Sequence, residues 1–339
     1  MPETAPLNVT VYMRADCGLC DDVRQNLAAL QKKFPHRLAE IDIDADPVLH
    51  EKFFDQIPVV EVGPYTLRAP MSRQDLAMTL GAARDRREQL VQTGGDQYLE
   101  RVRKGQSASF GDGVYFWLSR HYLALLNLII FIYVGLPFVA PVLMKSDAPG
   151  LARVIHKMYS PLCHQFGFRS FFLFGEQPYY PLQEAGLASL RTFQQASGLT
   201  DVANPYSVSR LYARQYTGDE IVGYKVALCE RDVAIYAAML LFGLVYGLTK
   251  RRLPPLHWLA WVLIGLGPIG LDGVSQIVSQ FDLPSLAQIL PYRESTPFLR
   301  VLTGGLFGFG TAWFAFPNIE ESMRETRQFF IKKFAIAKA

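Results

Sequence analysis

Four long apolar segments without charged side chains dominate the second two-thirds of the chain. They cover residues 122–144, 233–249, 253–271 and 301–319. Each has about 17 to 23 residues, which is long enough for a helix to cross a hydrocarbon core about 30 Å thick. The pattern therefore predicts about four transmembrane helices, packed as an all-α membrane bundle over residues 121–319.

A different pattern, typical of strands and short helices, occupies the first 83 residues. Apolar and polar residues alternate over 9–14, and a helix is expected to follow and to run to Lys33. A last helix starts after the N-cap residue Ser72 and is expected to end at Gly81. Between them the pattern predicts strands at 37–44, 57–62 and 65–69 and a short helix at 47–54. The predicted order is βαβαββα, which indicates an α/β domain.

Basic residues are concentrated beside the apolar segments in three clusters. With four membrane crossings, all three clusters fall on the same side of the bilayer. Because short loops rich in Lys and Arg stay in the cytoplasm, we expect both chain ends to be cytoplasmic and loop 145–232 to lie outside. The stretch 84–120 is predicted to be a polar, partly helical linker, and 320–339 a basic cytoplasmic tail. The clusters are Arg101, Arg103, Lys104 and Arg120; Lys250, Arg251 and Arg252; and Arg324, Arg327, Lys332, Lys333 and Lys338.

One segment of the outer loop is ambiguous. Residues 158–175, MYSPLCHQFGFRSFFLFG, are rich in apolar side chains but include His164 and Arg169. A fifth crossing here would place the basic clusters on opposite sides of the bilayer. We therefore expect this segment to lie at the membrane interface or to re-enter the membrane from the outside.

Composition narrows the setting of the protein. The chain has 339 residues, of which 50% are hydrophobic and 19% charged, and its formal net charge is +3. It is too apolar for one ordinary soluble domain and has no basic stretch interleaved with aromatic residues, so nucleic acid is not an expected partner. The N-terminus has no basic start followed by an apolar run, and we expect no cleavable signal peptide. The expected surroundings are the lipid bilayer and the cytoplasm.

Two of the four cysteines stand close together in the first domain. Cys17 and Cys20 lie at the predicted turn from the first strand to the first helix, where the helix dipole and free backbone N–H groups stabilise a thiolate. Three nearby carboxylates, Asp16, Asp21 and Asp22, oppose this effect. The pair could instead be half of a zinc site, although no second cysteine pair or histidine pair stands nearby.

The order of the elements, the motif Cys17-Gly18-Leu19-Cys20 and Ile57-Pro58 ahead of the third strand resemble the glutaredoxin-like branch of the thioredoxin fold. The resemblance covers about residues 7–83. It implies a catalytic site in which Cys17 attacks, Cys20 resolves the intermediate, and Pro58 stands where a cis bond is feasible. It also implies glutathione or thioredoxin as reductant and a protein thiol or small thiol as partner, unless the fold has kept its cysteines but lost its substrate.

A second set of polar residues is expected to converge at the outer ends of the predicted spans. The topology places Cys163, His164, Cys229, Asp232 and Asp272 at one depth, where isolated ionisable groups are costly. Zinc and copper suit such a mixture of soft and hard ligands. These five residues therefore form a candidate metal site, with Asp272 as a candidate base.

Four stretches of this region resemble successive motifs of a bacterial and archaeal membrane family, domain of unknown function 2085. They are CHQFGFRSFF, LCERDVAIYAA, LDGVSQ and RESTPFLRVLTGGLFGFG, within about 155–317. The resemblance implies a bacterial or archaeal plasma membrane but no particular reaction. This chain has Asp232 where the family has the second cysteine of a pair, which weakens a redox role but keeps a metal ligand. The matching positions are Cys163, His164, Gln165, Cys229, Arg231, Ile235, Tyr236, Asp272, Gly273 and Gln276.

Simpler roles remain for the residues of the second site. Cys163 and Cys229 could form a structural disulfide, because an outer location is oxidising. His164 could be an ordinary packed histidine, and Asp272 could simply pair with a neighbouring guanidinium. The candidate partners of that carboxylate are Arg231 and Arg300.

Three functions fit these patterns. The leading one is a membrane-anchored thiol–disulfide oxidoreductase whose cytoplasmic Cys17/Cys20 site exchanges electrons with a partner thiol. The alternatives are a metal-binding membrane enzyme that uses the outer site, and a non-catalytic scaffold or small transporter. A direct relay between the two cysteine pairs is not expected, because about 30 Å of hydrocarbon separates them.

Overall fold

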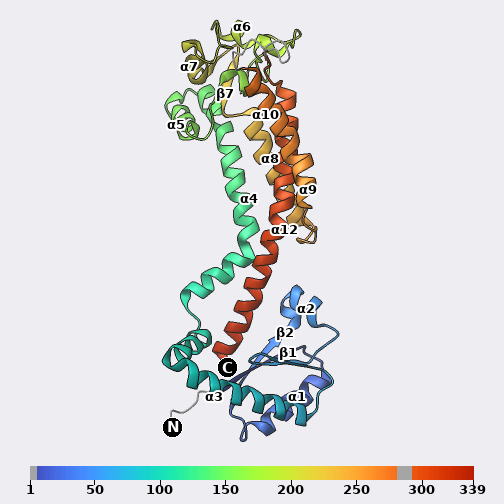
Figure 1. The fold of residues 1–339 in the computed structure, drawn as a ribbon. Helices are drawn as coiled ribbons and strands as arrows, with labels where there is room; N and C mark the ends of the chain where they lie inside the picture. Colours follow the sequence, from blue (N-terminus) through green and yellow to red (C-terminus); the bar gives the residue numbers. More distant parts are fainter. Residues whose placement is uncertain (1–5, 281–291) are drawn as a thin grey trace. The chain divides into compact units, whose positions relative to one another are not determined.

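The computed structural model of the chain describes residues 6–280 and 292–339 (Figure 1). The chain divides into two compact units. The first unit contains the chain up to His121 together with Glu321–Ala339, and the second unit is Tyr122–Glu320. Two long helices, α4 (Phe110–Lys145) and α12 (Pro297–Lys338), therefore contribute residues to both units.

A four-stranded mixed sheet forms the centre of the first unit. Its strand order is β2-β1-β3-β4, with β1 parallel to β2 and antiparallel to β3. The predicted order βαβαββα and the thioredoxin-like fold are confirmed. The elements are β1 (Leu7–Met13), α1 (Gly18–Leu30), β2 (His36–Asp42), the 3₁₀ helix η1 (Ile43–Ala45), α2 (Pro47–Phe53), β3 (Val59–Val62), β4 (Tyr65–Arg68) and α3 (Arg73–Gln106).

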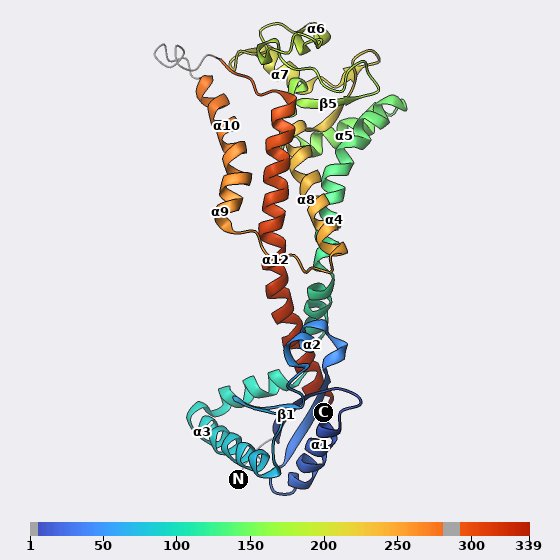
Figure 2. The ribbon, with the colours of Figure 1, turned by 90° about the vertical axis from the view of Figure 1, so that its right-hand side faces the viewer.

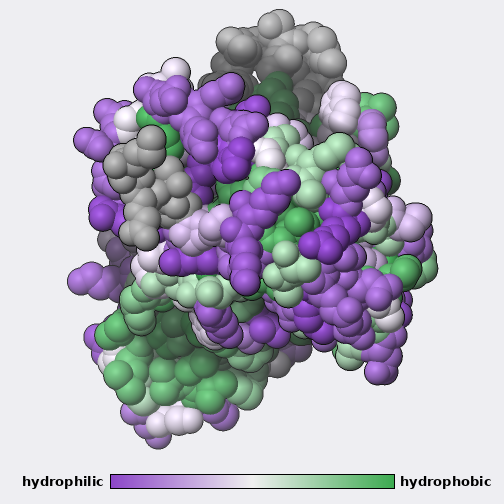
Figure 3. Space-filling model, turned by 90° about the horizontal axis from the view of Figure 1, so that it is seen from below, coloured by the Kyte–Doolittle hydropathy of each residue, from purple (hydrophilic) through white to green (hydrophobic). Residues whose placement is uncertain are grey.

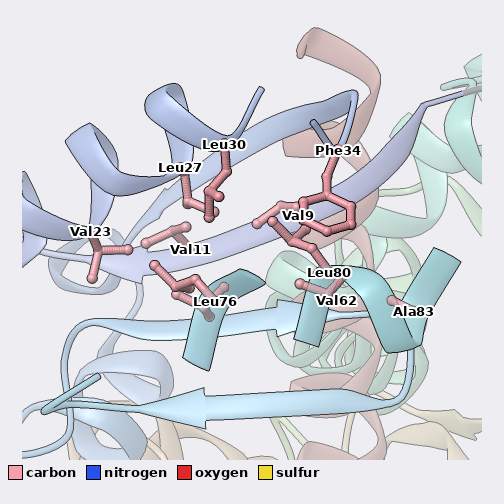
Figure 4. Packing of buried hydrophobic residues seen from close by; sticks show 11 residues of the cluster. Val9, Val11, Val23, Leu27, Leu30, Phe34, Val62, Leu76, Leu80 and Ala83 are labelled. Atoms are coloured by element: carbon pink, nitrogen blue, oxygen red, sulfur yellow. The ribbon is translucent and has the colours of Figure 1, made fainter. Parts of the chain in front are cut away.

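The alternation of side chains along β1 builds two apolar layers, because successive residues of a strand point to opposite faces. Val9 and Val11 lie on one face, where leucines of α1 and α3 cover them (Figure 4). Tyr12 lies on the other face, with its ring centroid 4.6 Å from that of Phe53 in α2. The sheet is therefore packed on both sides, as a central sheet of this class requires.

The last part of α12 contributes to the second of these faces. Ile331 and Ala335, one helical turn apart, pack against the apolar cluster that contains Tyr12. Lys332 Nζ lies 2.6 Å from a carboxylate oxygen of Glu61 in β3. Residues 320–339, which the sequence predicts as a basic tail, are thus the end of a long helix that packs on the sheet.

The helix predicted to end at Gly81 is longer than expected, and α3 continues to Gln106. Gly81 does not take the left-handed conformation of a helix cap. The residues after it are mostly Ala, Arg, Glu and Gln, whose helix propensity offsets the cost of about 1 kcal/mol for one glycine. The real interruption is Gly95, with φ 50° and ψ −143°. Since α4 begins at Phe110, residues 84–120 are mostly helical.

Within residues 6–280 and 292–339, four helices are long and apolar enough to cross a membrane, as predicted. Two are α4 and α12, and the third is α8 (Glu230–Leu248). The fourth, Trp258–Ser279, joins α9 (Trp258–Ala260), the π-helical turn η4 (Trp261–Leu266) and α10 (Gly267–Ser279). Large apolar side chains such as Ile129 and Phe131 stay exposed on α4, which suits contact with lipid. On the face that Figure 3 presents, hydrophilic and hydrophobic residues gather in separate areas.

Glycines of α12 allow the neighbouring helices to approach closely. A Cβ on Gly308 would lie 2.0 Å from the carbonyl oxygen of Ile235 in α8, and Gly304 also faces the α8 backbone. On another side of α12, a Cβ on Gly310 would lie 3.7 Å from the Cα of Gly265 in η4. Helix α12 therefore packs between α8 and the α9–α10 segment (Figure 2). This is the role that small residues at helical spacing have in membrane bundles.

The chain between α4 and α8 folds into a compact part of the second unit, which the sequence predicts only as a long loop. Its sheet has the antiparallel order β5-β7-β6, and aromatic residues such as Phe168, Phe172 and Tyr180 fill its core. The ambiguous segment 158–175 forms no transmembrane helix in this structure. The elements are α5 (Pro149–Tyr159), η2 (Gly167–Arg169), β5 (Ser170–Leu173), η3 (Gln183–Ala185), α6 (Phe193–Ser197), α7 (Val208–Gln215), β6 (Gly218–Asp219) and β7 (Gly223–Cys229).

Candidate functional site

The first candidate site is the cysteine pair at the start of α1. Cys17 occupies the N-cap position, and its Sγ accepts a hydrogen bond from the Cys20 backbone N–H at 3.2 Å. The two sulfurs are joined in a disulfide whose Cα atoms are 5.2 Å apart. Cys17 is half-buried, whereas Cys20 is only 1% exposed. A thiol from outside can therefore approach Cys17 but not Cys20, which is the asymmetry that attacking and resolving roles need.

Pro58 stands at the end of the sheet from which the chain runs to this pair. Its peptide bond with Ile57 is cis, and its side chain is buried. The antiparallel register pairs Tyr12 of β1 with Val59 of β3, so Pro58 continues this pairing toward the end of β1. The structure thus places all three residues predicted for the catalytic site at one end of the sheet.

The aspartates around the cysteine pair have less effect than their number suggests. Asp21 is paired with Arg24, whose Nη1 lies 2.8 Å from the carboxylate and whose Nε lies 2.7 Å from Glu40. Asp16 and Asp22 are exposed to solvent. Water and salt screen such surface charges, so they oppose a thiolate only weakly.

The second candidate site is a cluster of Cys163, Cys229 and Asp232, which we call the Cys–Asp cluster. One ligand atom from each residue lies within 4.8 Å of the other two. Cys163 follows α5, whereas Cys229 ends β7 and Asp232 stands in the first turn of α8. The Cys229 Sγ–H donates to Asp232 Oδ2 at 3.1 Å. Both cysteines are free thiols in the structure, so the disulfide considered from the sequence is not formed.

The two thiols of this cluster differ in acidity. A hydrogen bond with the Cys229 thiol lowers the pKa of Cys163 below its ordinary value, and the Gln165 backbone N–H, 3.5 Å from the same sulfur, acts in the same direction. The interaction with Cys163, followed by burial, raises the pKa of Cys229 well above its ordinary value. Cys163 is therefore the member of the pair that more readily carries a negative charge.

The donor set of the Cys–Asp cluster fits a zinc ion. Two thiolates and one carboxylate give three protein ligands, the number that catalytic zinc sites use. Ligand bonds of about 2.0 to 2.3 Å place neighbouring ligand atoms about 3.3 to 3.8 Å apart in a tetrahedral site. The observed upper limit of 4.8 Å is close to this spacing, so small side-chain rotations suffice.

His164 and Asp272, the other two residues predicted for this site, lie elsewhere. The His164 ring is exposed and stacks on Phe166, with ring centroids 5.7 Å apart. Asp272 is buried and pairs with two guanidinium groups, one of them Arg231. Its other oxygen lies 2.7 Å from Arg293 Nη2. The simpler interpretation of Asp272, as the partner of an arginine, is thus the geometry observed.

A buried charged network near the start of α12 is centred on Glu294, a residue for which no role was predicted. Glu294 is 3% exposed, and its carboxylate accepts two hydrogen bonds from Arg169, at 2.7 and 2.9 Å, and one from Arg300. Arg300 also lies 3.1 Å from Glu230. Burial raises the pKa of Glu294, but the guanidinium groups of Arg169 and Arg300 together outweigh burial and hold that pKa below its ordinary value. The motif RESTPFLR contains Glu294 and Arg300, which pair with each other, but their other partners, Arg169 and Glu230, are 125 and 70 positions away.

Comparison with known families matches the two parts of the chain separately. The model of a glutaredoxin-like domain, domain of unknown function 836, matches residues 8–81. The model of a family described as predicted membrane protein, domain of unknown function 2085, matches residues 220–314. Both resemblances seen in the sequence are thus confirmed. The second match includes Cys229, Asp232 and Asp272 but begins after Cys163.

Comparison with known proteins and solved structures gives a partial match to one relative. A stretch of 101 residues is 29% identical to an uncharacterized protein of Methanocaldococcus jannaschii and covers 29% of this chain. It spans 55% of that relative, or about half of its length. No solved structure matches the chain.

Proposed function

We propose that this protein is a membrane-anchored thiol–disulfide oxidoreductase. It joins a glutaredoxin-like domain to a membrane domain that matches domain of unknown function 2085. The observation that carries the proposal is the Cys17–Cys20 disulfide across the first turn of α1, with one accessible and one buried sulfur. The four apolar helices support a bilayer as the environment of the rest of the chain. In this proposal the membrane domain determines where the thiol chemistry occurs.

The proposed reaction begins with the reduced pair. The Cys17 thiolate attacks one sulfur of a substrate disulfide, that S–S bond breaks, and the departing thiolate takes a proton from water. Cys20, once deprotonated, attacks the Cys17 sulfur of the mixed disulfide and releases the second substrate thiol. Two electrons have then passed to the substrate, and the pair is left as the disulfide seen here. A thiol reductant such as glutathione or thioredoxin restores the dithiol.

We further propose that this chemistry takes place in the cytoplasm. An even number of crossings puts both chain ends on one side of the bilayer, and the basic residues beside the spans favour the cytoplasmic side. The cytoplasm also supplies the reducing thiols that the cycle needs. The Cys–Asp cluster then faces the opposite compartment.

Trapping of the mixed disulfide tests the oxidoreductase proposal. In the full chain purified in detergent, Cys20→Ser removes the resolving sulfur, so a disulfide substrate should remain attached to Cys17. The matched variant Cys17→Ser should form no such adduct, because the remaining Cys20 sulfur is buried. Peptide mass spectrometry identifies the modified residue, and the wild type should return to the free Cys17–Cys20 disulfide. Equal adducts on Cys17 and Cys20 in the two variants would contradict the assigned roles.

A second candidate function, metal binding, rests on the Cys–Asp cluster. The observation that favours it is the grouping of three ligand atoms within 4.8 Å. We expect one zinc ion per purified chain, and Co²⁺ in its place should give a thiolate charge-transfer absorption. Cys163→Ser should remove both signals, whereas exposed Asp201→Asn should leave them unchanged. A metal content equal in wild type and Cys163→Ser would rule this function out and leave the cluster as a structural feature.

A further inference from the structure

A cavity of about 460 Å³ in the second unit is lined by residues of α5, α7 and β7. Figure 1 shows where these three elements lie. Four of the side chains that line it are cationic, and among the described lining residues none is an Asp or a Glu. The cationic residues are Arg153 and Lys157 of α5, Arg214 of α7 and Lys225 of β7. A concentration of positive charge without carboxylates is costly unless water or an anion balances it.

Lys225 adds most to the energetic cost of this positive charge, because its side chain is only 1% exposed. Its Nζ donates to the carbonyl oxygens of Gln165, at 2.8 Å, and Arg214, at 2.7 Å. An ammonium has three N–H donors, so these two bonds leave one donor. Carbonyl oxygens also carry no full charge, and within the described residues no carboxylate forms an ion pair with this lysine. The buried charge is therefore hydrogen-bonded but not neutralised.

His156 supplies a second, independent sign that a group belongs in this cavity. Its side chain lines the cavity and is 9% exposed. Neither ring nitrogen has a hydrogen-bond partner among the described residues. Such a buried donor is normally satisfied, because leaving it without a partner costs about 1 to 3 kcal/mol. An acceptor in the cavity would satisfy the ring N–H.

We infer that this cavity binds a multivalent oxyanion, most simply the phosphoryl group of a lipid headgroup or of a soluble phosphate ester. Several oxygens on one centre can accept from Lys225, His156 and Lys157 together, which a single carboxylate cannot do as well. The volume exceeds that of phosphate alone and leaves room for part of an organic group. The two sources share this chemistry, and the experiment separates them.

The site lies next to the Cys–Asp cluster. The Gln165 backbone N–H lies 3.5 Å from Cys163 Sγ, while the carbonyl oxygen of the same residue accepts from Lys225. The Gln165 side chain also donates to the backbone oxygens of His156 and Ala227. Gln165 thus stands between Lys225 of the cavity and Cys163, the more acidic thiol of the Cys–Asp cluster.

Sulfate is the sharpest probe of the cavity, because its charge does not change between pH 6 and 8. Calorimetric titration of the purified full chain should detect sulfate binding at pH 6 and about tenfold weaker binding at pH 8. The reason is that burial lowers the pKa of Lys225 to about 7. The other cationic side chains that line the cavity are Arg153, Lys157 and Arg214. Burial lowers the pKa of His156 to about 4, so its ring stays neutral at both pH values. Cys163, the remaining neighbour, gains negative charge as pH rises, and its contribution is measured with Cys163→Ser.

Two variants with the same change of charge test the location. Lys157→Gln alters an exposed residue at the rim and should weaken sulfate binding about fivefold. Lys145→Gln alters an exposed lysine of α4 that does not line the cavity and should leave binding unchanged. In any binding that remains, Lys225→Gln should leave only the pH dependence that Cys163 contributes. Equal affinities in wild type and Lys157→Gln would overturn the assignment of the site.

Native mass spectrometry separates the two sources of the phosphoryl group. Both proteins are placed in nanodiscs of phosphatidylethanolamine and phosphatidylglycerol. If the wild type retains a phospholipid and Lys157→Gln does not, the phosphoryl group belongs to a lipid headgroup. Binding of sulfate and glycerol phosphate without a retained lipid identifies a soluble ester. The absence of both sulfate binding and a retained phospholipid would overturn the inference. These readouts do not depend on Cys17 or Cys20, so the redox proposal can fail or succeed separately.

Discussion

Buried charges in the second unit are stabilised in two different ways. Glu294 and Arg300 are nearly inaccessible, but each has a partner of opposite charge. Removal of one member would leave the other charge buried and uncompensated, at a cost of about 3 to 5 kcal/mol. Lys225 is equally buried and has only carbonyl oxygens as partners. At the scale of single residues, Lys225 is thus the buried charge for which the described part of the chain supplies no counter-charge.

The first prediction concerns the effect of Lys225 on stability. Burial and the nearby Arg214 lower its pKa from 10.5 to about 7, although Cys163 acts in the opposite direction. Between these values the unfolded chain binds a proton that the folded chain has released. The free energy of unfolding therefore rises with pH across this window, by about 2 kcal/mol between pH 7 and 9.

Thermal unfolding of the full chain at pH 7, 8 and 9 measures this effect. The melting temperature of Lys225→Met should rise less with pH than that of the wild type, because the methionine has no proton to release. The exposed Lys157→Met serves as the matched control and should keep the wild-type slope. A slope that Lys225→Met leaves unchanged would show that this lysine keeps its proton in the folded protein.

The placement of site residues could be predicted from the sequence where the geometry is local. The spacing of Cys17 and Cys20 fixes them on one helical turn, and Cys229 and Asp232 meet for the same reason. Cys163 is far from Cys229 and Asp232 in the sequence, but the predicted topology of four spans places it on the same side of the membrane as these two residues. Lys225 reaches the cavity because it lies in β7 of a small, irregular sheet. The hydrophobic pattern of the sequence does not predict that sheet. The sequence therefore predicted that the cysteines of each site lie close together, but not the cavity that α5, α7 and β7 line.

At the scale of elements, glycines determine how closely α12 packs on α8. The space beside Gly308 is occupied by the α8 backbone itself, which cannot rotate away as a flexible side chain can. Gly305 lies on the same helix, and a methyl group added there would have no atom within 4 Å. The two residues therefore separate the packing role of a glycine from its poor helix propensity.

We predict opposite effects for an added methyl group at these two positions. Gly308→Ala should force α8 and α12 apart and destabilise the second unit by about 1 to 3 kcal/mol. Gly305→Ala should be neutral or stabilise it by up to about 1 kcal/mol, because alanine is the better helix former. Denaturation of both variants in the same detergent, followed by tryptophan fluorescence, gives the comparison. Equal destabilisation would mean that the helices are not in contact at Gly308.

The C-terminal end of α12 allows a similar test in the first unit. Ala335 packs against the apolar cluster of the sheet, whereas Ala337 is exposed. Ala335→Asp should destabilise this unit by about 2 kcal/mol or more, because it would place a carboxylate against the apolar cluster of the sheet. Ala337→Asp should have little effect. Hydrogen exchange of β1 amides reports the difference, and equal protection in both variants would show that the helix end does not support the sheet.

Elements were predictable where periodicity was sustained. The four spans and the seven elements of the first domain follow from long apolar runs and from clear alternation. The predicted end of α3 is wrong because Gly81 resembles a cap in the sequence, although the tertiary structure accepts it inside the helix beside Phe34. The chain between α4 and α8 has several elements of two to five residues, which are too short to show a period.

At the scale of the whole molecule, the division into units bears on topology. The start of α4 and the end of α12 belong to the same compact unit as the thioredoxin-like sheet. Within that unit, Arg327 donates to the Ser119 carbonyl oxygen at 2.7 Å, and Lys333 lies 2.7 Å from Asp112. A chain that leaves this unit through α4 and returns to it through α12 must cross a bilayer an even number of times. The four apolar helices satisfy this condition.

The last prediction assigns sides to these crossings. Glu184 is an exposed residue between α4 and α8, and Ala339 is the exposed C-terminal residue. With four crossings and basic residues retained in the cytoplasm, Glu184→Cys should react with a membrane-impermeant maleimide in intact cells. Ala339→Cys should react only after the membrane is permeabilised, which also shows that the introduced thiol is reactive. Peptide mass spectrometry separates each label from the native cysteines. Labelling of Ala339→Cys in intact cells would reverse the topology and would move the Cys17–Cys20 site out of the reducing compartment on which the proposed cycle depends.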